Sequence, residues 1–72
     1  MAYILMEIQT TDGNTAVLPP LVYTDRKEAE SAYHSKLAYA AQSTCDVHTV
    51  SLLDIYGCAI RAEHYDKEEA EV

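Results

Sequence analysis

Residues 25–43, DRKEAESAYHSKLAYAAQS, decide the fold because their apolar side chains recur at spacings of three and four. Such spacing predicts a helix over residues 26–43 with one apolar stripe. The stripe consists of Ala29, Tyr33, Leu37, Ala40 and Ala41. Asp25 can cap the helix, and Glu28 three positions later can complete a capping box. We expect the stripe to lie against a sheet, because a single helix cannot bury it alone.

Two extended segments precede the helix. Residues 3–10, YILMEIQT, alternate between two faces, and residues 14–18, NTAVL, can return as a second strand. Asp12-Gly13 between them supplies the positive-φ pair of a tight hairpin turn. Pro19-Pro20 ends the second strand, because neither proline can donate a hydrogen bond to a ladder.

A second hairpin follows the helix. Residues 47–55 are extended, with Val47, Thr49, Ser51 and Leu53 on one face and His48, Val50 and Leu52 on the other. The turn Asp54-Ile55-Tyr56-Gly57 suits type I geometry, with its glycine in the left-handed region. Residues 58–65, CAIRAEHY, form the last predicted strand, in which Arg61, Glu63 and Tyr65 share one face.

The predicted fold is therefore α+β, with the order β-β-α-β-β and a four-stranded antiparallel sheet that carries one helix on one face. Residues 1–65 make a single domain, and residues 66–72, DKEEAEV, make an acidic, flexible tail. The first strand has a fully apolar face of Ile4, Met6 and Ile8, which we expect beneath the helix. Tyr3 and Leu5 would then lie on an uncovered apolar face, which self-association would cover.

Charge and composition limit the partners. Twelve acidic residues against five basic ones give a net charge of -7, which disfavours a phosphate-binding surface and makes nucleic acid an improbable partner. The chain shows neither a signal-like start nor an apolar run of about 20 residues, so we expect a cytosolic protein without a membrane partner. Cys45 and Cys58 flank a strand about 30 Å long, too far apart for a disulfide.

A metal site is the first chemical possibility to weigh. Cys45 and His48 have the spacing of a zinc half-site, and an antiparallel last strand brings His64 toward them. Zinc needs three or four converging ligands, and structural sites usually pair two half-sites. We therefore expect no metal and no cofactor, with these three residues as the runner-up ligand set, and read Cys45 as a small apolar filler.

The chain also lacks the residues of a recognisable enzyme. It contains no G-x-S-x-G motif and no glycine-rich phosphate loop, and Cys45, Asp46 and His48 start a strand on which side chains alternate in direction. We expect a non-enzymatic protein without catalytic residues. Six tyrosines in the absence of tryptophan and phenylalanine favour an interface, since tyrosine is enriched at such surfaces.

The candidate residues for binding an oligomer partner or another protein are Tyr3, Leu5, Tyr39, Tyr56, Arg61 and Tyr65. Tyr33 belongs instead to the core, with its hydroxyl at the rim. Copies of Arg61 in an oligomer can form a small cationic pocket, although an ion pair with Glu63 or Glu7 is the simpler expectation. The alternative reading of the tyrosines is that they pack on their own neighbours.

Three segments, YILMEIQT-TDG, DRKEAESAYHSKLAYAAQS and VHTVSLLDIYG, resemble small uncharacterised proteins encoded by phages and prophages of gut Clostridia and related Firmicutes. The most specific part is EAESAYHSKLAYAA, and the glutamate-rich end is similar too. The resemblance implies a viral origin and the cytoplasm of a bacterial host, and it transfers no catalytic or binding residue. This chain has DIYG where a short polar turn is often seen in those proteins, so the resemblance implies no surface role for that turn.

These observations together predict a non-enzymatic, homo-oligomeric phage accessory protein that acts by binding. The expected role is counter-defence, either by sequestering a host immune nucleotide signal or by inhibiting a host immune protein. The alternative is a minor structural or assembly protein of the phage tail region.

Overall fold

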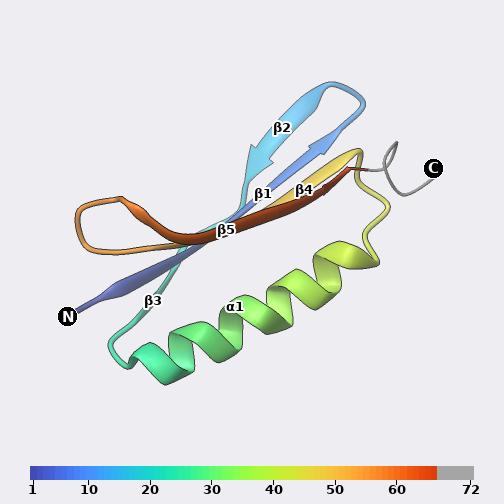
Figure 1. Ribbon diagram of the computed structural model, residues 1–72. Helices are drawn as coiled ribbons and strands as arrows, with labels where there is room; N and C mark the ends of the chain where they lie inside the picture. Colours follow the sequence, from blue (N-terminus) through green and yellow to red (C-terminus); the bar gives the residue numbers. More distant parts are fainter. Residues whose placement is uncertain (67–72) are drawn as a thin grey trace.

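One helix lies along one face of an antiparallel sheet in the computed structural model of the chain, which describes residues 1–66 (Figure 1). The elements in chain order are β1 (Tyr3–Thr11), β2 (Asn14–Val17), β3 (Leu21–Tyr23), α1 (Arg26–Ala41), β4 (Val47–Leu53) and β5 (Ala59–Asp66). The predicted α+β class is confirmed, but the sheet has five strands where four were predicted. The proposed tail beyond Asp66 lies outside the described residues.

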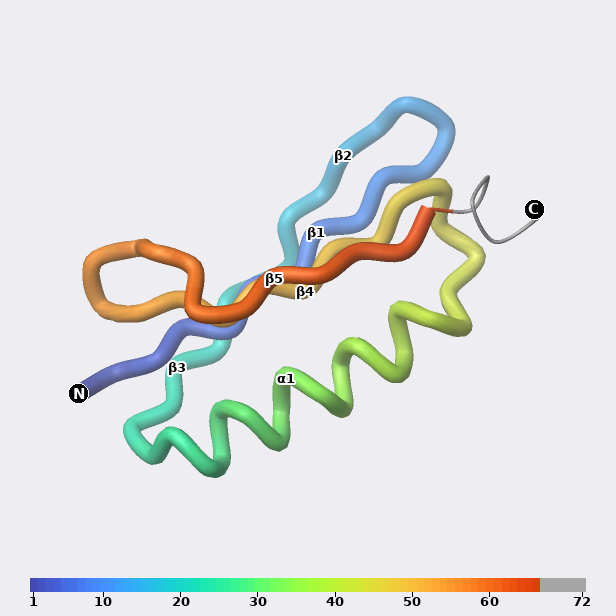
Figure 2. Tube along the Cα trace, in the orientation of Figure 1, coloured from blue at the N-terminus to red at the C-terminus, as the bar shows by residue number. Residues whose placement is uncertain are grey.

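The additional strand arises because the two prolines interrupt an edge strand rather than ending it. The strand order is β2-β1-β4-β5, and β3 pairs with the same edge of β1 as β2, further toward the start of β1 (Figure 2). Ile8 lies opposite Val17 and Leu5 lies opposite Leu21. The edge therefore advances by four residues where β1 advances by three, so the segment with the two prolines holds one extra residue, as in a β-bulge. The Leu18 N–H keeps the ladder together by donating to the Glu7 carbonyl at 2.9 Å.

Both predicted hairpin turns are confirmed. Asp12 and Gly13 have φ values of 52° and 80°, as a turn that matches the twist of the strands requires. The Asp46 carboxylate secures this turn by accepting a hydrogen bond from the Asp12 N–H at 2.9 Å. In the second turn, Gly57 has a φ of 83° and its N–H donates to the Asp54 carbonyl at 3.0 Å.

The helix begins as predicted and ends two residues early, at Ala41. The Asp25 carboxylate caps it by accepting from the Lys27 N–H at 2.8 Å. Of the predicted stripe, Ala29, Tyr33 and Ala40 are buried and Leu37 packs against the core while partly exposed. Ala41, the last member, is exposed because the chain leaves the helix there.

The core lies between α1 and the sheet, and it uses the opposite face of β1 from the one predicted. Its buried apolar members are Leu5, Ala29, Tyr33, Ala40, Val50 and Leu52. Leu5 is only 3 % exposed, so the expectation that it lies on the uncovered face was wrong. β1 has apolar residues on both faces, Ile4, Met6 and Ile8 on one and Tyr3 and Leu5 on the other, and the helix covers the face that carries Leu5 together with Val50 and Leu52 of β4.

The remaining face of the sheet has no element over it in the described residues. We call it the open face, and its central residues are Ile4, Met6 and Ile8 of β1 with Val47, Thr49, Ser51 and Leu53 of β4. Four aliphatic residues of this face are partly exposed: Ile4, Ile8, Val47 and Leu53. The predicted uncovered apolar face therefore exists, but it is built from the other set of side chains.

Candidate functional site

A groove of about 640 Å³ lies between the C-terminal half of α1 and the sheet. Its lining includes Glu7, Gln9, Lys36, Tyr39, Gln42 and His48. A smaller hollow of about 260 Å³ adjoins it, shares Glu7, Leu18 and Lys36 with it, and is otherwise walled by apolar residues of β1 and the proline segment. One continuous depression thus runs beside the helix, polar at its C-terminal end and apolar toward β3.

The floor of the groove holds a buried acid and base. Nε2 of His48 lies 2.6 Å from Oε2 of Glu7, and their side chains are 5 % and 11 % exposed. The ammonium of Lys36 lies 3.7 Å from the other oxygen of Glu7 and is 39 % exposed. Glu7 thus bridges a buried imidazole and a partly exposed cation, as a buried carboxylate requires.

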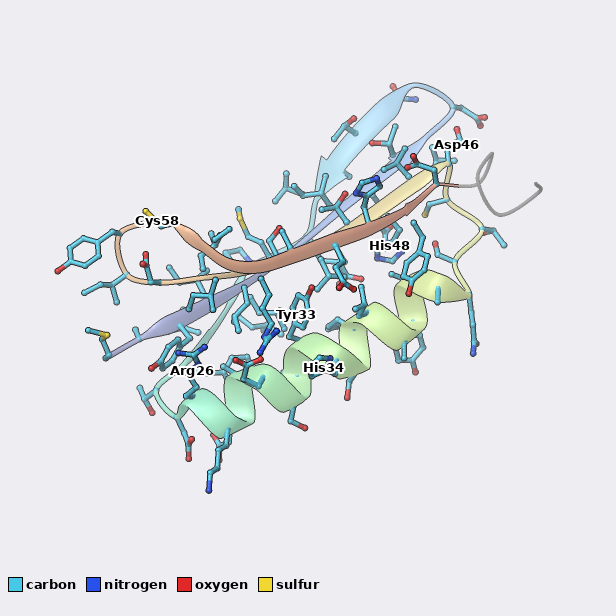
Figure 3. All side chains as sticks on the ribbon, viewed as in Figure 1. Arg26, Tyr33, His34, Asp46, His48 and Cys58 are labelled. Carbon is cyan, nitrogen blue, oxygen red and sulfur yellow. The ribbon has the colours of Figure 1, made fainter. Side chains whose placement is uncertain are left out.

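Strand pairing explains why these groups meet. In the antiparallel register His48 lies opposite Gln9 and Glu7 lies opposite Val50, so Glu7 and His48 are diagonal neighbours on the face under the helix. Figure 3 shows His48 between the sheet and the C-terminal half of α1. Sequence analysis missed this pair, although a signal existed. The covered face of β4 carries one polar residue, His48, among apolar ones, and the covered face of β1 carries Glu7 and Gln9, so polar side chains of the two adjacent strands should meet.

His48 also has hydrogen-bonding capacity left over. Its Nδ1 is buried and finds no hydrogen-bond partner within residues 1–66. None of the side-chain hydrogen bonds in this part of the chain joins a serine, threonine or cysteine to the Glu7–His48 pair. Because Nδ1 is buried, the polar groups that the groove presents to a ligand are those of its more exposed lining, Lys36, Tyr39 and Gln42.

The runner-up metal ligands do not converge. His64 lies opposite Thr49, so its side chain is on the open face, whereas His48 faces the helix. Cys45 precedes β4, and its N–H donates to the Ser43 hydroxyl at 3.1 Å. Within residues 1–66, no three histidine, cysteine or acidic side chains are grouped closely enough to hold a metal ion.

The two cysteines are free thiols at opposite ends of β4. Figure 3 shows Cys58 on the turn between β4 and β5, far from the end of β4 that Asp46 marks. Cys58 is exposed and Cys45 is partly buried.

Arg61 lies on the helix side of the sheet, where it binds Glu30 rather than the predicted Glu63 or Glu7. Its Nε lies 2.5 Å from one Glu30 oxygen, and Nε of Arg26 lies 3.2 Å from the other. The hydrogen bond from Arg61 is the main cause that lowers the pKa of Glu30, with Arg26 adding to it and burial opposing it. Arg61 is thus neutralised within one copy of the chain.

The other predicted interface residues do not share one surface. Tyr3 packs against the core beside the buried Leu5, so neither belongs to an uncovered face. Tyr65 lies opposite His48 and is 42 % exposed at the edge of the sheet. Tyr39, at 75 % exposed, flanks the groove, and Tyr56, at 79 % exposed, lies on the turn between β4 and β5.

Tyr33 is in the core, as predicted, but its hydroxyl does not reach the rim. The side chain points from α1 toward the sheet (Figure 3) and is 1 % exposed. The hydroxyl has no hydrogen-bond partner within the described chain. Burial, followed by the nearby charge of Glu63, raises the pKa of this phenol, so Tyr33 stays neutral.

Comparison of the chain with family models, curated proteins and solved structures found no match in any of the three. The resemblance to phage proteins therefore stays a prediction from the sequence. Within residues 1–66 the single helix is too short and too polar to cross a bilayer.

Proposed function

We propose that the chain is a non-enzymatic binding protein that holds a small ligand in the groove between α1 and the sheet. The observation that carries this proposal is the buried Glu7–His48 pair at the floor of the groove. A depression with a few convergent polar groups is the usual form of a small-molecule site. Tyr39, largely exposed at the mouth of the groove, offers an aromatic surface for a planar group.

The charges of the groove favour a neutral or cationic ligand over a phosphorylated one. Its cation, Lys36, already lies beside Glu7, and the last turn of α1 carries no basic residue. Carbonyl groups at a helix C-terminus and a net charge of -7 both repel anions. The nucleotide ligand expected from the sequence therefore fits this groove poorly if it carries several phosphates, whereas a nucleobase or an amine fits better.

The biological setting that we infer rests on the sequence resemblance alone. In the cytoplasm of an infected bacterium, such a protein would serve counter-defence by sequestering a host signal or by blocking an immune protein. Deletion of the gene should then reduce phage growth on at least one host that carries a defence system. Detection of the protein at fixed copy number in purified virions would instead support the tail-protein alternative.

The binding proposal is tested by nuclear magnetic resonance titration of the ¹⁵N-labelled protein with adenosine, putrescine and ATP. We expect adenosine or putrescine to shift the amide signals of Lys36, Tyr39 and Gln42, and ATP to shift them least. The variant Glu7→Gln should lose the response, whereas Glu63→Gln, on the exposed strand β5, should keep it. Absence of shifts for all three probes, or binding of ATP that is independent of Glu7, would contradict the proposal.

A further inference from the structure

The open face has no ionisable side chain at its centre. Its positions on β1 and β4 carry only aliphatic residues, methionine, threonine and serine. Among the strand residues of the described chain, charge enters this face at one corner of β5, where His64 and Asp66 lie 3.7 Å apart. An uncharged sheet surface in a chain with 24% charged residues is a strong departure from the rest of the protein.

The apolar surface continues onto the edge strand. Val17 lies opposite Ile8 and is 56 % exposed, and Val22 lies opposite Ile4 and is 65 % exposed. Both valines point to the same side as the central residues, because residues directly opposite each other share a face. The open face therefore spans the sheet from its β2–β3 edge across β1 to β4.

The size of this surface suits a stable interface. A nine-residue strand such as β1 is about 30 Å long, and the three strand positions of this surface, spaced by about 4.8 Å, are about 14 Å wide. Side-chain relief raises this flat area of about 430 Å² toward the ~600 Å² that each partner contributes at the lower end of standard interfaces. Contiguous apolar patches of several hundred Å² often mark interaction sites.

We propose that two copies of the chain pack face to face through the open face, with their helices on the outside. An uncharged aliphatic surface offers a partner no charge pattern to recognise, but it complements itself in a two-fold interface. The charged network of Glu30, Arg26 and Arg61 lies on the helix side, so the two copies approach without apposing it. The result is a two-sheet sandwich with the sheets about 10 Å apart.

The chain's small core gives a further reason for a second copy. Six buried apolar residues form the core, and a single core in a chain of this length rarely supplies more than about 3–5 kcal/mol. Pairing of the open face removes further apolar side chains from water, including the partly exposed Ile4, Ile8 and Leu53. The proposal is independent of ligand binding, because the groove lies on the helix side and stays accessible in the dimer.

Edge-to-edge pairing is the competing arrangement. The β2–β3 edge is interrupted by its prolines, which protects it from another strand. The free edge of β5 carries a bulge opposite Leu52 and Leu53 and includes Arg61 and Glu63, which also discourage pairing. The face therefore suits association better than either edge does.

The test is sedimentation velocity of the full chain from about 1 to about 100 μM, a range that separates weak from stable dimers. We expect the unmodified chain to be a dimer over most of this range. Met6→Lys and Thr49→Lys each place a charge at the centre of the open face and should weaken the dimer about a hundredfold or more. Ser31→Lys adds the same charge on the exposed side of α1 and should leave the dimer unchanged.

Thr49→Lys removes no apolar side chain, so it keeps the test valid if Met6→Lys fails to fold; circular dichroism reports the fold of each variant. A monomer at every concentration overturns the proposal. A dimer that persists in both open-face variants also overturns the proposal, and would indicate that the two copies pair through the edge of β5 instead. Adenosine or putrescine binding by the Thr49→Lys monomer would show that the groove and the dimer are separate properties.

Discussion

The covered and open faces of the sheet differ in an unexpected direction. The covered face carries Glu7 and His48 beneath the helix, while the centre of the open face carries no ionisable side chain. On polarity alone, the helix should have covered the other side. The difference shows that the face covered by the helix follows from chain connectivity and side-chain size, with the polar groups accommodated by pairing and by Lys36.

Connectivity acts through the crossover from β3 to β4. Both strands run antiparallel to β1 on its opposite edges, so they are parallel to each other and α1 connects them. The Glu7 side chain points toward the helix, and the Glu7 backbone carbonyl points toward the β2–β3 edge, where it accepts a hydrogen bond from the Leu18 N–H. The chirality of an L-amino acid then fixes on which side of β1 each neighbouring strand lies when β1 is viewed from the helix. With β3 and β4 on those sides, the crossover is right-handed. Nearly all such connections have this hand, so the strand order dictates the face under the helix.

Adjacent leucines of β4 provide the sharpest test of the two faces. Leu52 is fully buried under the helix, whereas Leu53 lies on the open face. Leu52→Ala should cost about 2–5 kcal/mol of unfolding free energy, comparable to the whole stability of the domain. Leu53→Ala should cost less than about half as much when urea unfolding is measured at concentrations where the chain is monomeric.

The same pair distinguishes folding from association. In sedimentation experiments Leu53→Ala should weaken the dimer, because it removes apolar surface from the open face. Equal losses of unfolding free energy for both leucines in the monomer would mean that the two faces are equally covered. That outcome would contradict the difference in burial between the covered face and the open face.

The polar groups of the covered face give the next largest expected effect. Glu7→Leu or His48→Leu should each cost about 1–3 kcal/mol, because each leaves a buried polar partner unpaired. The double variant should cost less than the sum of the two, since neither partner then remains alone. Urea unfolding of the four proteins at neutral pH measures the coupling; additive losses would show that the pair is not coupled.

The order of elements and both turns could be predicted because their signals are local. Asp12-Gly13 and Asp54 to Gly57 specify turns through backbone geometry that neighbouring residues determine. The three residues of β3 could not be predicted, since a strand that short has no alternation to detect. Without β3 there is no crossover, and without the crossover the face under the helix stays undetermined.

The candidate site was less predictable than the fold. Leu5 and Arg61 were interface candidates because of the strand face predicted for each, and strand alternation alone does not reveal that Leu5 is buried under the helix or that Arg61 binds Glu30. The groove depends on the register between β1 and β4, which brings Glu7 and His48 together across 41 positions of sequence. Register between distant strands is a property of the assembled sheet, not of either segment.

Tyr33 provides a smaller test within the covered face. Its buried hydroxyl has no partner in the described chain, so it contributes desolvation cost without a hydrogen bond. Tyr33→Phe should therefore leave stability unchanged or raise it by up to about 1 kcal/mol, measured by urea unfolding. Tyr33→Leu, which loses the ring, should lower stability. A loss for Tyr33→Phe would mean that the hydroxyl is hydrogen-bonded in solution.

The smallest expected effect concerns pH and the ion pairs at the edge of the covered face. Because Arg61 and Arg26 lower the pKa of Glu30 in the folded chain, the folded state favours the ionised carboxylate. The resulting stabilisation is fully present above the ordinary pKa of 4.5 and is lost as the pH falls through the lowered value. The difference in thermal midpoint between the unmodified chain and Glu30→Gln should therefore shrink from about pH 7 to about pH 3.

The background Arg61→Gln supplies the control for this pH effect, because it removes the main cause of the lowered pKa. In that background, Glu30→Gln should change the pH dependence less than it does in the unmodified chain. An identical pH profile in the two backgrounds would show that the Arg61 contact does not persist in solution. Arg61 would then be free for the partner role that the sequence predicted, and the helix side of the sheet, opposite the uncharged open face, would carry an available cation.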